Sequence, residues 1–491
     1  MSKRQAANTA AAQGAWYAAP TWQALLPWVL VLVSLAVRLY YLRLTHAQPV
    51  WWDEAEYLIK ARNIALGAPD TGFSLHRPLF FSVAMAGFYA VGLGELAIRV
   101  ALLVPAVAAV YLTYRVGERL VGAAAGFVGA WLFGMHYMSL FYSMRILTEV
   151  PHVALCLWGT HLFLTQRRAA VVLSLPVLVL AVFTRFPAAF MLVALAIYCV
   201  ISEGTAALRR REYWMSAALG VLVTVPFGVQ SYVAHGHPLF AWQAAGYTMP
   251  SMDLMTRLQG LGEYGRQVQP SVGWLLLALL VGGVFLLLVR AVWFRGGARG
   301  DGAALVLLWM ILPLLYFCLF VRPAVDRYII LALPPAFLAI GYCTVRIGEL
   351  AGRVHGSASV VVMLAVMGWA TVQFLPFADR IIRGKVTSYD GLRDAGRWIK
   401  ENSGPEDVVL SRSVAQLTYY SERRGETIPE DRTEFDAMMA ARKPRYVVLS
   451  RYEPHPQWTR NVRADALGLR VIAGFPKGRV EAVVLERLAV P

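Results

Sequence analysis

The sequence predicts a mainly α-helical, polytopic membrane protein that ends in a small soluble α/β domain. Of its 491 residues, 58% are hydrophobic and only 15% are charged, and the mean hydropathy is +0.52. Long apolar runs follow one another from residue 24 to residue 377, whereas residues 378–491 are polar with short apolar stretches. This composition is typical of a chain that crosses a bilayer several times.

Apolar runs of roughly 17 residues or more can cross a bilayer as helices, and the chain has about eleven runs near or above this length. They lie at residues 24–44, 97–116, 121–138, 150–166, 168–183, 186–202, 214–233, 272–290, 303–321, 328–346 and 357–376.

Short arginine clusters between these runs carry much of the net charge of +16. Cytoplasmic loops are enriched in Lys and Arg, so we expect these clusters and an N-terminal tail, residues 1–23, to lie in the cytoplasm. The loops and the tail on the opposite side of a cell membrane are then 45–96, 139–149, 235–271, 322–327 and 378–491. This topology explains the charge without a nucleic-acid partner.

One apolar stretch, Pro78–Leu93, does not fit this alternation. Counted as a span, it would reverse the side of every later loop and place the following arginine cluster outside. We therefore expect a helix that lies in the membrane interface, or that dips into the membrane and returns.

The tail predicts a small α/β domain. Its strand-like runs are Val408–Ser411, Tyr446–Ser450, Val471–Ala473 and Ala482–Glu486. We expect one helix to start with Ser388 as its cap and to end at Lys400, and another over Glu434–Ala441. The tail has no Gly-rich phosphate loop and no nucleophile motif. We expect a lid or docking domain, and choice of the acceptor is a hypothesis for its role.

The motif Trp51-Trp52-Asp53-Glu54-Ala55-Glu56-Tyr57 directly follows the first apolar run. Charges are costly in hydrocarbon, so membrane proteins keep them at the water boundary or for function. Asp53 and Glu54 are therefore candidate catalytic residues. The neighbours that would line a substrate site are Trp52, Glu56 and Tyr57.

More charged residues lie in the other predicted external loops, and the topology brings them to the same membrane boundary. They are His76, Arg77, Arg145, Glu149, Arg322, Arg327 and Tyr328. Carboxylates can act as general bases, and arginines can bind a phosphate and stabilise it as it leaves. We therefore predict a transfer reaction with a lipid-linked phosphate leaving group, with Glu149 among the catalytic acids and the other residues near the phosphate.

Each of these residues also has a structural explanation. Trp51, Trp52 and Tyr57 can belong to an aromatic belt at the interface. Asp53 and Glu54 can stabilise the first turn of the helix that follows, and loop arginines can act as interface anchors. A metal site at His235 and His237 is disfavoured because no third ligand is evident nearby.

Four motifs occur in a fixed order along the membrane part. They are Asp53-Glu54 with Tyr57, His76-Arg77-Pro78, Arg145-x-x-x-Glu149 and Arg327-Tyr328-x-x-x-x-x-Pro334. This ordered set resembles the GT-C glycosyltransferases, and within them the protein O-mannosyltransferases and the lipid A aminoarabinose transferases. The soluble tail resembles those of some prokaryotic members.

The resemblance implies a GT-C fold with interfacial helices in the first external loop, and a polyprenyl-phosphate-linked sugar as donor. A single sugar would pass, with inversion, to a hydroxyl of a protein, a lipid or a glycan. Asp53 would be the base toward this hydroxyl, and Glu149 would orient the base or the acceptor. The residues near the donor phosphate would be Arg77, Arg327 and Tyr328.

The chain departs from these families at several positions. The aminoarabinose transferases have Arg at the position of Glu56, Lys at that of Arg77 and Asp at that of Glu149, and the doubled proline of the mannosyltransferases is absent. These differences leave the sugar and the acceptor open rather than the reaction class.

No catalytic metal or other cofactor is expected, as in the families compared. Other GT-C enzymes do need a metal. The carboxylates that would hold Mg²⁺ or Mn²⁺ here are Asp53, Glu54 and Glu149.

Other function classes fit a similar topology. A glycan ligase or polymerase would use a lipid-pyrophosphate donor. A flippase or transporter of lipid-linked sugars would have ionisable residues at mid-membrane and paired broken helices, and no matched pair stands out. A binding protein with a decayed site is disfavoured because the acid and base positions are filled. The lipid product, monophosphate or pyrophosphate, separates the transferase that uses a polyprenyl-phosphate sugar from the ligase or polymerase.

Overall fold

The structure, a computed structural model, describes residues 20–70, 77–238, 253–293, 298–459 and 462–488. The chain forms two compact units. The membrane unit contains the first helix up to Leu42, residues 101–144 and residues 148–382. The loop–tail unit contains residues 43–100, 145–147 and the chain from 383 onward. The predicted N-terminal tail, residues 1–23, lies almost wholly outside the described residues.

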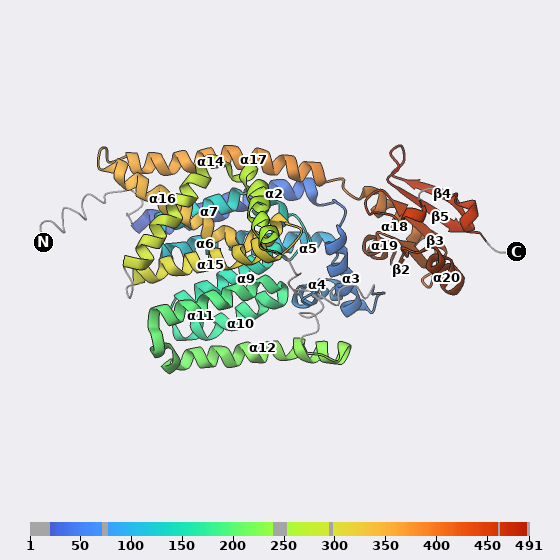
Figure 1. Cartoon of the computed structure of the whole chain (residues 1–491), viewed down its shortest axis with the longest axis horizontal. Coiled ribbons are helices and arrows are strands. Elements are labelled where there is room, and N and C mark those ends of the chain that lie inside the picture. Colours follow the sequence, from blue (N-terminus) through green and yellow to red (C-terminus); the bar gives the residue numbers. More distant parts are fainter. Residues whose placement is uncertain (1–19, 71–76, 239–252, 294–297, 460–461, 489–491) are drawn as a thin grey trace, which may run out of the picture. The chain divides into compact units, whose positions relative to one another are not determined.

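The membrane unit consists of helices (Figure 1). They are α2 (Pro20–Thr45), α6 (Leu103–Leu120), α7 (Ala123–Met135), α8 (Tyr137–Ser143), α9 (Glu149–Leu164), α10 (Arg168–Thr184), α11 (Ala189–Glu203), α12 (Arg211–His235), α14 (Leu254–Trp293), α15 (Ala298–Phe320), α16 (Leu333–Gly352) and α17 (Ala358–Lys385). Short 3₁₀ segments include η3 (Phe186–Ala188), η4 (Gly204–Arg209) and η5 (Asp326–Ala332). Helices α9, α10 and α12 pack side by side (Figure 1).

Small residues allow close contact between helices α7 and α16. A Cβ on Gly341 would lie 2.3 Å from the carbonyl oxygen of Ala125, and one on Gly129 would lie 3.0 Å from the backbone of Leu338. Helices in lipid associate largely through close van der Waals packing, because lipid tails are as apolar as the side chains. The glycines therefore hold α16 directly against α7.

Each predicted span overlaps one helix or two consecutive helical segments. Within the described residues, eight helices are long and apolar enough to cross a membrane, and the bent pair α7–α8, with an angle of 54°, would make nine. Helices α9 and α10 are shorter, with 16 and 17 residues. The chain is therefore a multi-pass membrane protein, and the number of eleven crossings stays a prediction.

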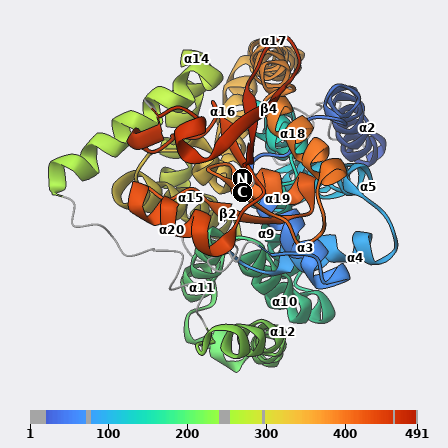
Figure 2. The same cartoon turned by 90° about the vertical axis from the view of Figure 1, so that its right-hand side faces the viewer.

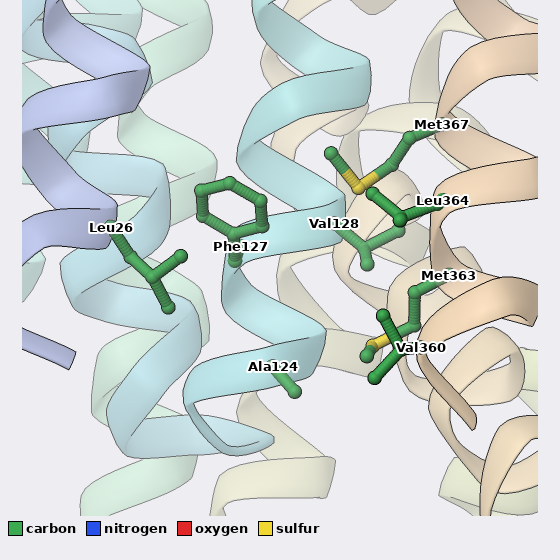
Figure 3. Close-up of a pocket in the computed structure, with 8 residues that line it drawn as sticks. All are labelled: Leu26, Ala124, Phe127, Val128, Val360, Met363, Leu364 and Met367. Atoms are coloured by element: carbon green, nitrogen blue, oxygen red, sulfur yellow. The ribbon is translucent and has the colours of Figure 1, made fainter. Parts of the chain in front are cut away.

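A small apolar recess lies between α2, α7 and α17 (Figure 3). Figure 3 shows Phe127 between Leu26 on one side and the α17 side chains on the other. Its lining is Leu26, Ala124, Phe127, Val128, Val360, Met363, Leu364 and Met367. These side chains have no group that could bind or activate a polar substrate, so the recess is not a candidate active site.

The loop–tail unit begins with α3 (Trp52–Leu66) and α4 (Phe80–Ala90) in the first predicted external loop. They are followed by α5 (Glu95–Ala101), most of which falls within the predicted span 97–116. Helix α4 lies where the sequence predicts an interfacial helix. Its 11 residues span about 16 Å, which is too short for a hydrocarbon core of about 30 Å.

The tail folds as an α/β domain with a five-stranded sheet in the order β2-β1-β3-β5-β4. Strands β1 (Val408–Ser411), β2 (Arg424–Thr427) and β3 (Tyr446–Ser450) are parallel, whereas β4 (Leu469–Phe475) and β5 (Ala482–Arg487) form antiparallel pairs. Apolar side chains of α18 (Asp390–Asn402) and α19 (Val414–Ser421) pack on one face of this sheet, and those of α20 (Arg432–Arg442) pack on the other. Figure 2 shows these helices around the strands.

The four predicted strands and the helix over Glu434–Ala441 are confirmed. The prediction of Ser388 as a helix cap is wrong, because α18 begins at Asp390 after Tyr389, which has positive φ. Helix α19 and strand β2 were not predicted from the sequence. Strand β2 is a short edge strand, Arg-Gly-Glu-Thr, whose residues are mostly polar and leave no apolar alternation to detect.

Candidate active site

The candidate residues form two clusters, one in each unit. The acid-loop cluster, in the loop–tail unit, consists of Asp53, Glu54, Glu56, Arg77 and Arg145. The Glu149 cluster, in the membrane unit, consists of Glu149, Arg185 and Arg327.

Helix α3 presents the three acids of the acid-loop cluster from its first turn and a half. The backbone N–H of Trp51 donates to Glu54 Oε2 at 2.7 Å, which satisfies one free donor at the helix start. Acidic side chains are also favoured there by the helix dipole. The helix ends at Gly67, whose φ of 67° is accessible to glycine at little cost.

Glu54 is fully buried and its carboxylate is saturated with donors. Besides Trp51 N–H, it accepts a hydrogen bond from the backbone N–H of Ile146 at 2.7 Å and one from Arg145 at 3.1 Å. A second guanidinium, that of Arg99, lies 4.0 Å away. A buried charge is tolerated when it is paired and hydrogen-bonded in this way. Through these hydrogen bonds, Glu54 connects α3 to residues 145–147.

Arg145 also binds the backbone of two further segments of the loop–tail unit. It donates to the carbonyl of Pro49 at 3.1 Å and to that of Lys385 at 3.4 Å. Its guanidinium also lies 4.0 Å from the ring centre of Trp51, a cation–π geometry. Burial lowers the pKa of Arg145 to about 10, so the side chain is still cationic at neutral pH.

Asp53 and Glu56 share a single guanidinium. Arg77 donates to Asp53 Oδ1 at 2.8 Å and forms a close ion pair with Glu56 Oε2. Trp52 Nε1 donates to the other Glu56 oxygen at 2.7 Å. The Asp53 side chain is 19% exposed, whereas that of Glu56 is fully buried. Asp53 is thus the acid of this cluster that solvent or a substrate can reach.

Burial raises the pKa of Glu56 to about 7, although the positive charge of Arg77 opposes this shift. Arg77 itself stays cationic: its pKa is raised because the neighbouring acids and Tyr57 outweigh the effect of burial. The guanidinium lies 5.3 Å from the ring centre of Tyr57, and Tyr57 packs edge-on against Phe81 of α4. Glu56 and Tyr57 therefore contact Arg77, and Trp52 holds Glu56.

The Glu149 cluster is built at the start of α9. Glu149 is fully buried, with Oε1 3.1 Å from Arg185 and 3.7 Å from Arg327. Neither of its oxygens has a hydrogen-bond partner among the described residues. Arg185 follows the last residue of α10 and also donates to Thr148 Oγ1 at 3.1 Å. The cluster therefore contains a buried carboxylate with unused acceptor capacity.

The segment that carries Arg327 is held in place by Asp326. This carboxylate accepts hydrogen bonds from Tyr137 at 2.7 Å and from Tyr142 at 3.0 Å, both on α8. Tyr328 stacks on Phe317 with 5.3 Å between ring centres. Asp326 and Tyr328 thus orient η5, and Arg327 is the side chain between them that reaches Glu149.

Arg322 has a different environment from the one predicted. It donates to the carbonyls of Thr256, Val321 and Cys318 at 2.7–3.1 Å, and Glu263 lies 3.6 Å away. Because its donors are used by backbone carbonyls, Arg322 anchors the start of α14 to the end of α15 rather than presenting a free phosphate ligand.

The structure thus brings Asp53, Glu56 and Arg77 together, as the sequence predicts. Arg145 and Glu149 have different partners, although four positions separate them. His76 lies outside the described residues. Sequence reasoning gave no role at the site to Arg99 and Arg185. Their positions near the ends of apolar runs could have indicated such a role, because a charge at the edge of a membrane span needs a partner or a function.

A bound metal has no evident place in the part of the chain that the structure describes. There, no group of three or more His, Cys, Asp or Glu side chains could hold a metal ion. Glu54 has its oxygens occupied by backbone N–H groups and a guanidinium. The expectation that no metal is required stays a prediction.

Comparison with known proteins agrees with the helical architecture. A family model described as dolichyl-phosphate-mannose-protein mannosyltransferase matches residues 76–229. No curated protein has significant sequence similarity to the chain.

Two solved structures share the fold over most of the chain. ArnT from Cupriavidus metallidurans, bound to undecaprenyl phosphate, has a TM-score of 0.70 at 15% identity, with 94% of this chain and 98% of ArnT covered. AglB, an oligosaccharyltransferase from Archaeoglobus fulgidus in complex with an inhibitory peptide and a dolichol-phosphate, has a TM-score of 0.63 at 12% identity. The similarity covers 89% of this chain and 70% of AglB. The chain therefore shares its overall fold with these two proteins.

Proposed function

We propose that this protein is a membrane glycosyltransferase that moves a single sugar from a polyprenyl-phosphate donor to an acceptor hydroxyl. The acceptor is a protein, a lipid or a glycan at the extracytoplasmic face, where the loop–tail unit would lie. The observation that carries the proposal is the acid-loop cluster, in which a partly exposed carboxylate, Asp53, is held by the guanidinium of Arg77. Fold and family similarity support the reaction class.

The chemistry needs one base and one phosphate ligand, and the cluster has a candidate for each. In a single displacement with inversion, Asp53 takes the acceptor proton while the acceptor oxygen bonds to the anomeric carbon. The bond from that carbon to the phosphate oxygen breaks, and polyprenyl monophosphate leaves with both electrons. Arg77 stabilises the phosphate as negative charge grows on it.

The pairing of Asp53 with Arg77 suits both roles. An adjacent cation keeps a carboxylate ionised and therefore able to accept a proton. The same cation can turn to a phosphate once the donor binds, because a guanidinium binds carboxylate and phosphate with similar geometry. Glu54 has no free oxygen for catalysis, so we assign it a positioning role. Phosphate contacts by Arg327 and Tyr328, and orientation of the base or acceptor by Glu149, stay predictions.

The test is donor turnover by the purified full-length protein. Labelled polyprenyl-phosphate sugars are supplied with a membrane extract as acceptor, and wild type is compared with Asp53→Asn. Loss of a general base typically lowers the rate by about 10²–10⁴-fold, so transfer should fall by this amount while donor binding persists. Asp70→Asn is the matched control, since Asp70 forms a 2.8 Å ion pair with Lys60 and is similarly exposed, at 22%.

The released lipid identifies the reaction. Polyprenyl monophosphate is the expected product. Release of a lipid pyrophosphate would replace the proposal by a ligase or polymerase, and movement of an intact donor across the membrane would replace it by a flippase. Equal turnover by Asp53→Asn and wild type would remove Asp53 as the base.

A further inference from the structure

Five consecutive residues lead into helix α3, and each of them is held by a hydrogen bond to its backbone. Arg393 donates to the carbonyl of Ala47 at 3.2 Å, and Arg99 donates to that of Gln48 at 3.0 Å. Arg145 binds the carbonyl of Pro49, Tyr420 OH accepts the N–H of Val50 at 2.8 Å, and Glu54 accepts the N–H of Trp51. We call residues 47–51 the lead segment.

The tail domain supplies an important share of these bonds. Arg393 lies on α18 and Tyr420 on α19, more than 340 positions after the lead segment. Tyr389, just before α18, packs edge-on against Trp51 with 6.4 Å between ring centres. The tail domain therefore contacts the residues that immediately precede Asp53.

Helix α19 also contacts the helices of the first loop. Helices α19 and α3 pack against each other (Figures 1 and 2). The buried hydroxyl of Tyr419 lies 3.2 Å from Tyr89 OH on α4 and 3.2 Å from a Glu95 oxygen on α5. Arg62 of α3 donates to the Tyr419 carbonyl at 2.8 Å and lies 4.2 Å from its ring centre. Tyr419 and Tyr420 thus contact helices α3, α4 and α5 and the lead segment.

Burial makes these hydroxyls structural donors and acceptors rather than acids. It raises the pKa of Tyr419 far above the usual range, and it also raises the pKa of Tyr420. Both therefore keep their protons at any physiological pH. The Val50 N–H is buried, and a buried N–H without an acceptor is costly. Tyr420 is its partner, so the position of the lead segment depends on α19.

From this geometry we infer that the tail domain is a structural part of the catalytic site, and that Tyr420 is a positioning residue for Asp53. The inference rests on the proposed function, since it takes Asp53 as the base. Asp53 comes three residues after Val50, so a shift of the lead segment moves the first turn of α3. Misplacement of a reacting group by about 1 Å can lower a rate about 100-fold.

This inference changes the expected role of the tail. A domain that only selects the acceptor could be altered without slowing attack on the donor. A domain that positions the base affects turnover with every acceptor, including water.

The test is Tyr420→Phe in the full-length protein, with Tyr446→Phe as the matched control. Tyr446 is buried in the same domain and its hydroxyl donates to the carbonyl of Asn402 at 2.9 Å. Both substitutions remove one hydroxyl bonded to a backbone group and keep the ring. We expect similar thermal stability in the two variants. We also expect kcat to fall about 10- to 100-fold in Tyr420→Phe alone, with an unchanged donor KM.

Hydrogen exchange gives a second readout that does not depend on activity. Amides of the lead segment should exchange faster in Tyr420→Phe than in wild type, and at the wild-type rate in Tyr446→Phe. Unchanged exchange in Tyr420→Phe would show that Tyr420 does not hold the lead segment in place, and would overturn the inference. Faster exchange with wild-type kcat would overturn the positioning role. If the wild-type protein turned over no monophosphate donor, the proposed function would be overturned instead. Hydrogen exchange would still decide whether Tyr420 holds the lead segment in place.

Discussion

Glu54 and Glu149 are both fully buried carboxylates beside two arginines, yet their surroundings differ. Glu54 accepts two backbone N–H groups, and the side chains of its partners Arg145 and Arg99 are 1% and 2% exposed. Glu149 has no hydrogen bond among the described residues, and its partners Arg185 and Arg327 are 15% and 27% exposed. The same residue type is closed to ligands in one cluster and has free oxygens in the other.

This difference distinguishes structural from functional charge. A carboxylate saturated by backbone donors cannot change partners without loss of structure. A carboxylate whose cations reach solvent can exchange them for a substrate hydroxyl or a phosphate at a smaller cost. Burial alone therefore does not identify a catalytic acid, and the exposure of its counter-ions is the more useful guide.

The largest expected effect is on stability and comes from Glu54→Ala. Removal of one partner of a buried ion pair leaves an uncompensated charge and typically costs about 3–5 kcal/mol. Here both Arg145 and Arg99 would lose their shared carboxylate. Thermal unfolding in detergent would measure the loss. The control is Glu486→Ala, because Glu486 pairs with the largely exposed Arg470 at 2.7 Å, and such surface pairs contribute about 0–1 kcal/mol. Equal losses in the two variants would contradict a structural role for Glu54.

A smaller loss of stability is expected for Glu149→Gln. Its arginines keep access to water, so we expect a cost of about 1–2 kcal/mol, between those of buried and surface pairs. Turnover should nevertheless fall, if Glu149 orients the base or the acceptor. Unfolding and kcat are measured together, with Glu118→Gln, from a part-exposed 3.3 Å pair with Arg115, as the control. A variant as unstable as Glu54→Ala would remove the contrast between the two acids.

The smallest effect concerns pH and the donor. Because the pKa of Glu56 is raised to about 7, its carboxyl is neutral below this pH and ionised above it. The ionised form adds a negative charge beside Arg77 and competes with the donor phosphate. A unit charge at about 4 Å is worth about 1 kcal/mol in bulk water, roughly a 5-fold weaker affinity, and burial of Glu56 makes this a lower bound.

Donor KM, measured from one pH unit below to one above this pKa, should therefore rise with pH in wild type. In Glu56→Gln it should stay low and flat, because the amide cannot ionise. A rise that persists in this variant would assign the pH dependence to another group.

Much of the fold could be predicted from the sequence because lipid imposes strong local rules. A span must be long and apolar, so the runs from residue 24 to 377 marked the helices that the structure contains. The charge pattern of the later loops indicated that Pro78–Leu93 does not cross, and the structure contains there a helix of 11 residues, too short to cross. Strand β2 and helix α19 were missed, because β2 is mostly polar and α19 has only eight residues.

The candidate site was predicted only in part. Asp53 and Glu54 are neighbours in the motif, and the sequence does not indicate that Asp53 is accessible whereas the Glu54 carboxylate is saturated with hydrogen-bond donors. This difference depends on which groups face each side of α3. Arg322 resembled a phosphate ligand in sequence, but backbone carbonyls of α14 and α15 occupy its donors. The contact of Tyr420 with Val50 joins segments 370 positions apart, and no local pattern encodes it.

The sequence by itself determined that this protein lies in a membrane, where its helices run and which charged residues are unusual there. Hydrophobicity and length decide these points residue by residue, so they can be read locally. Only the tertiary structure decided which guanidinium faces which carboxylate, and that the tail domain holds the residues before Asp53. Such pairings depend on long-range packing, in which a shift of a few ångströms decides whether a carboxylate is buried and fully hydrogen-bonded or accessible to a substrate.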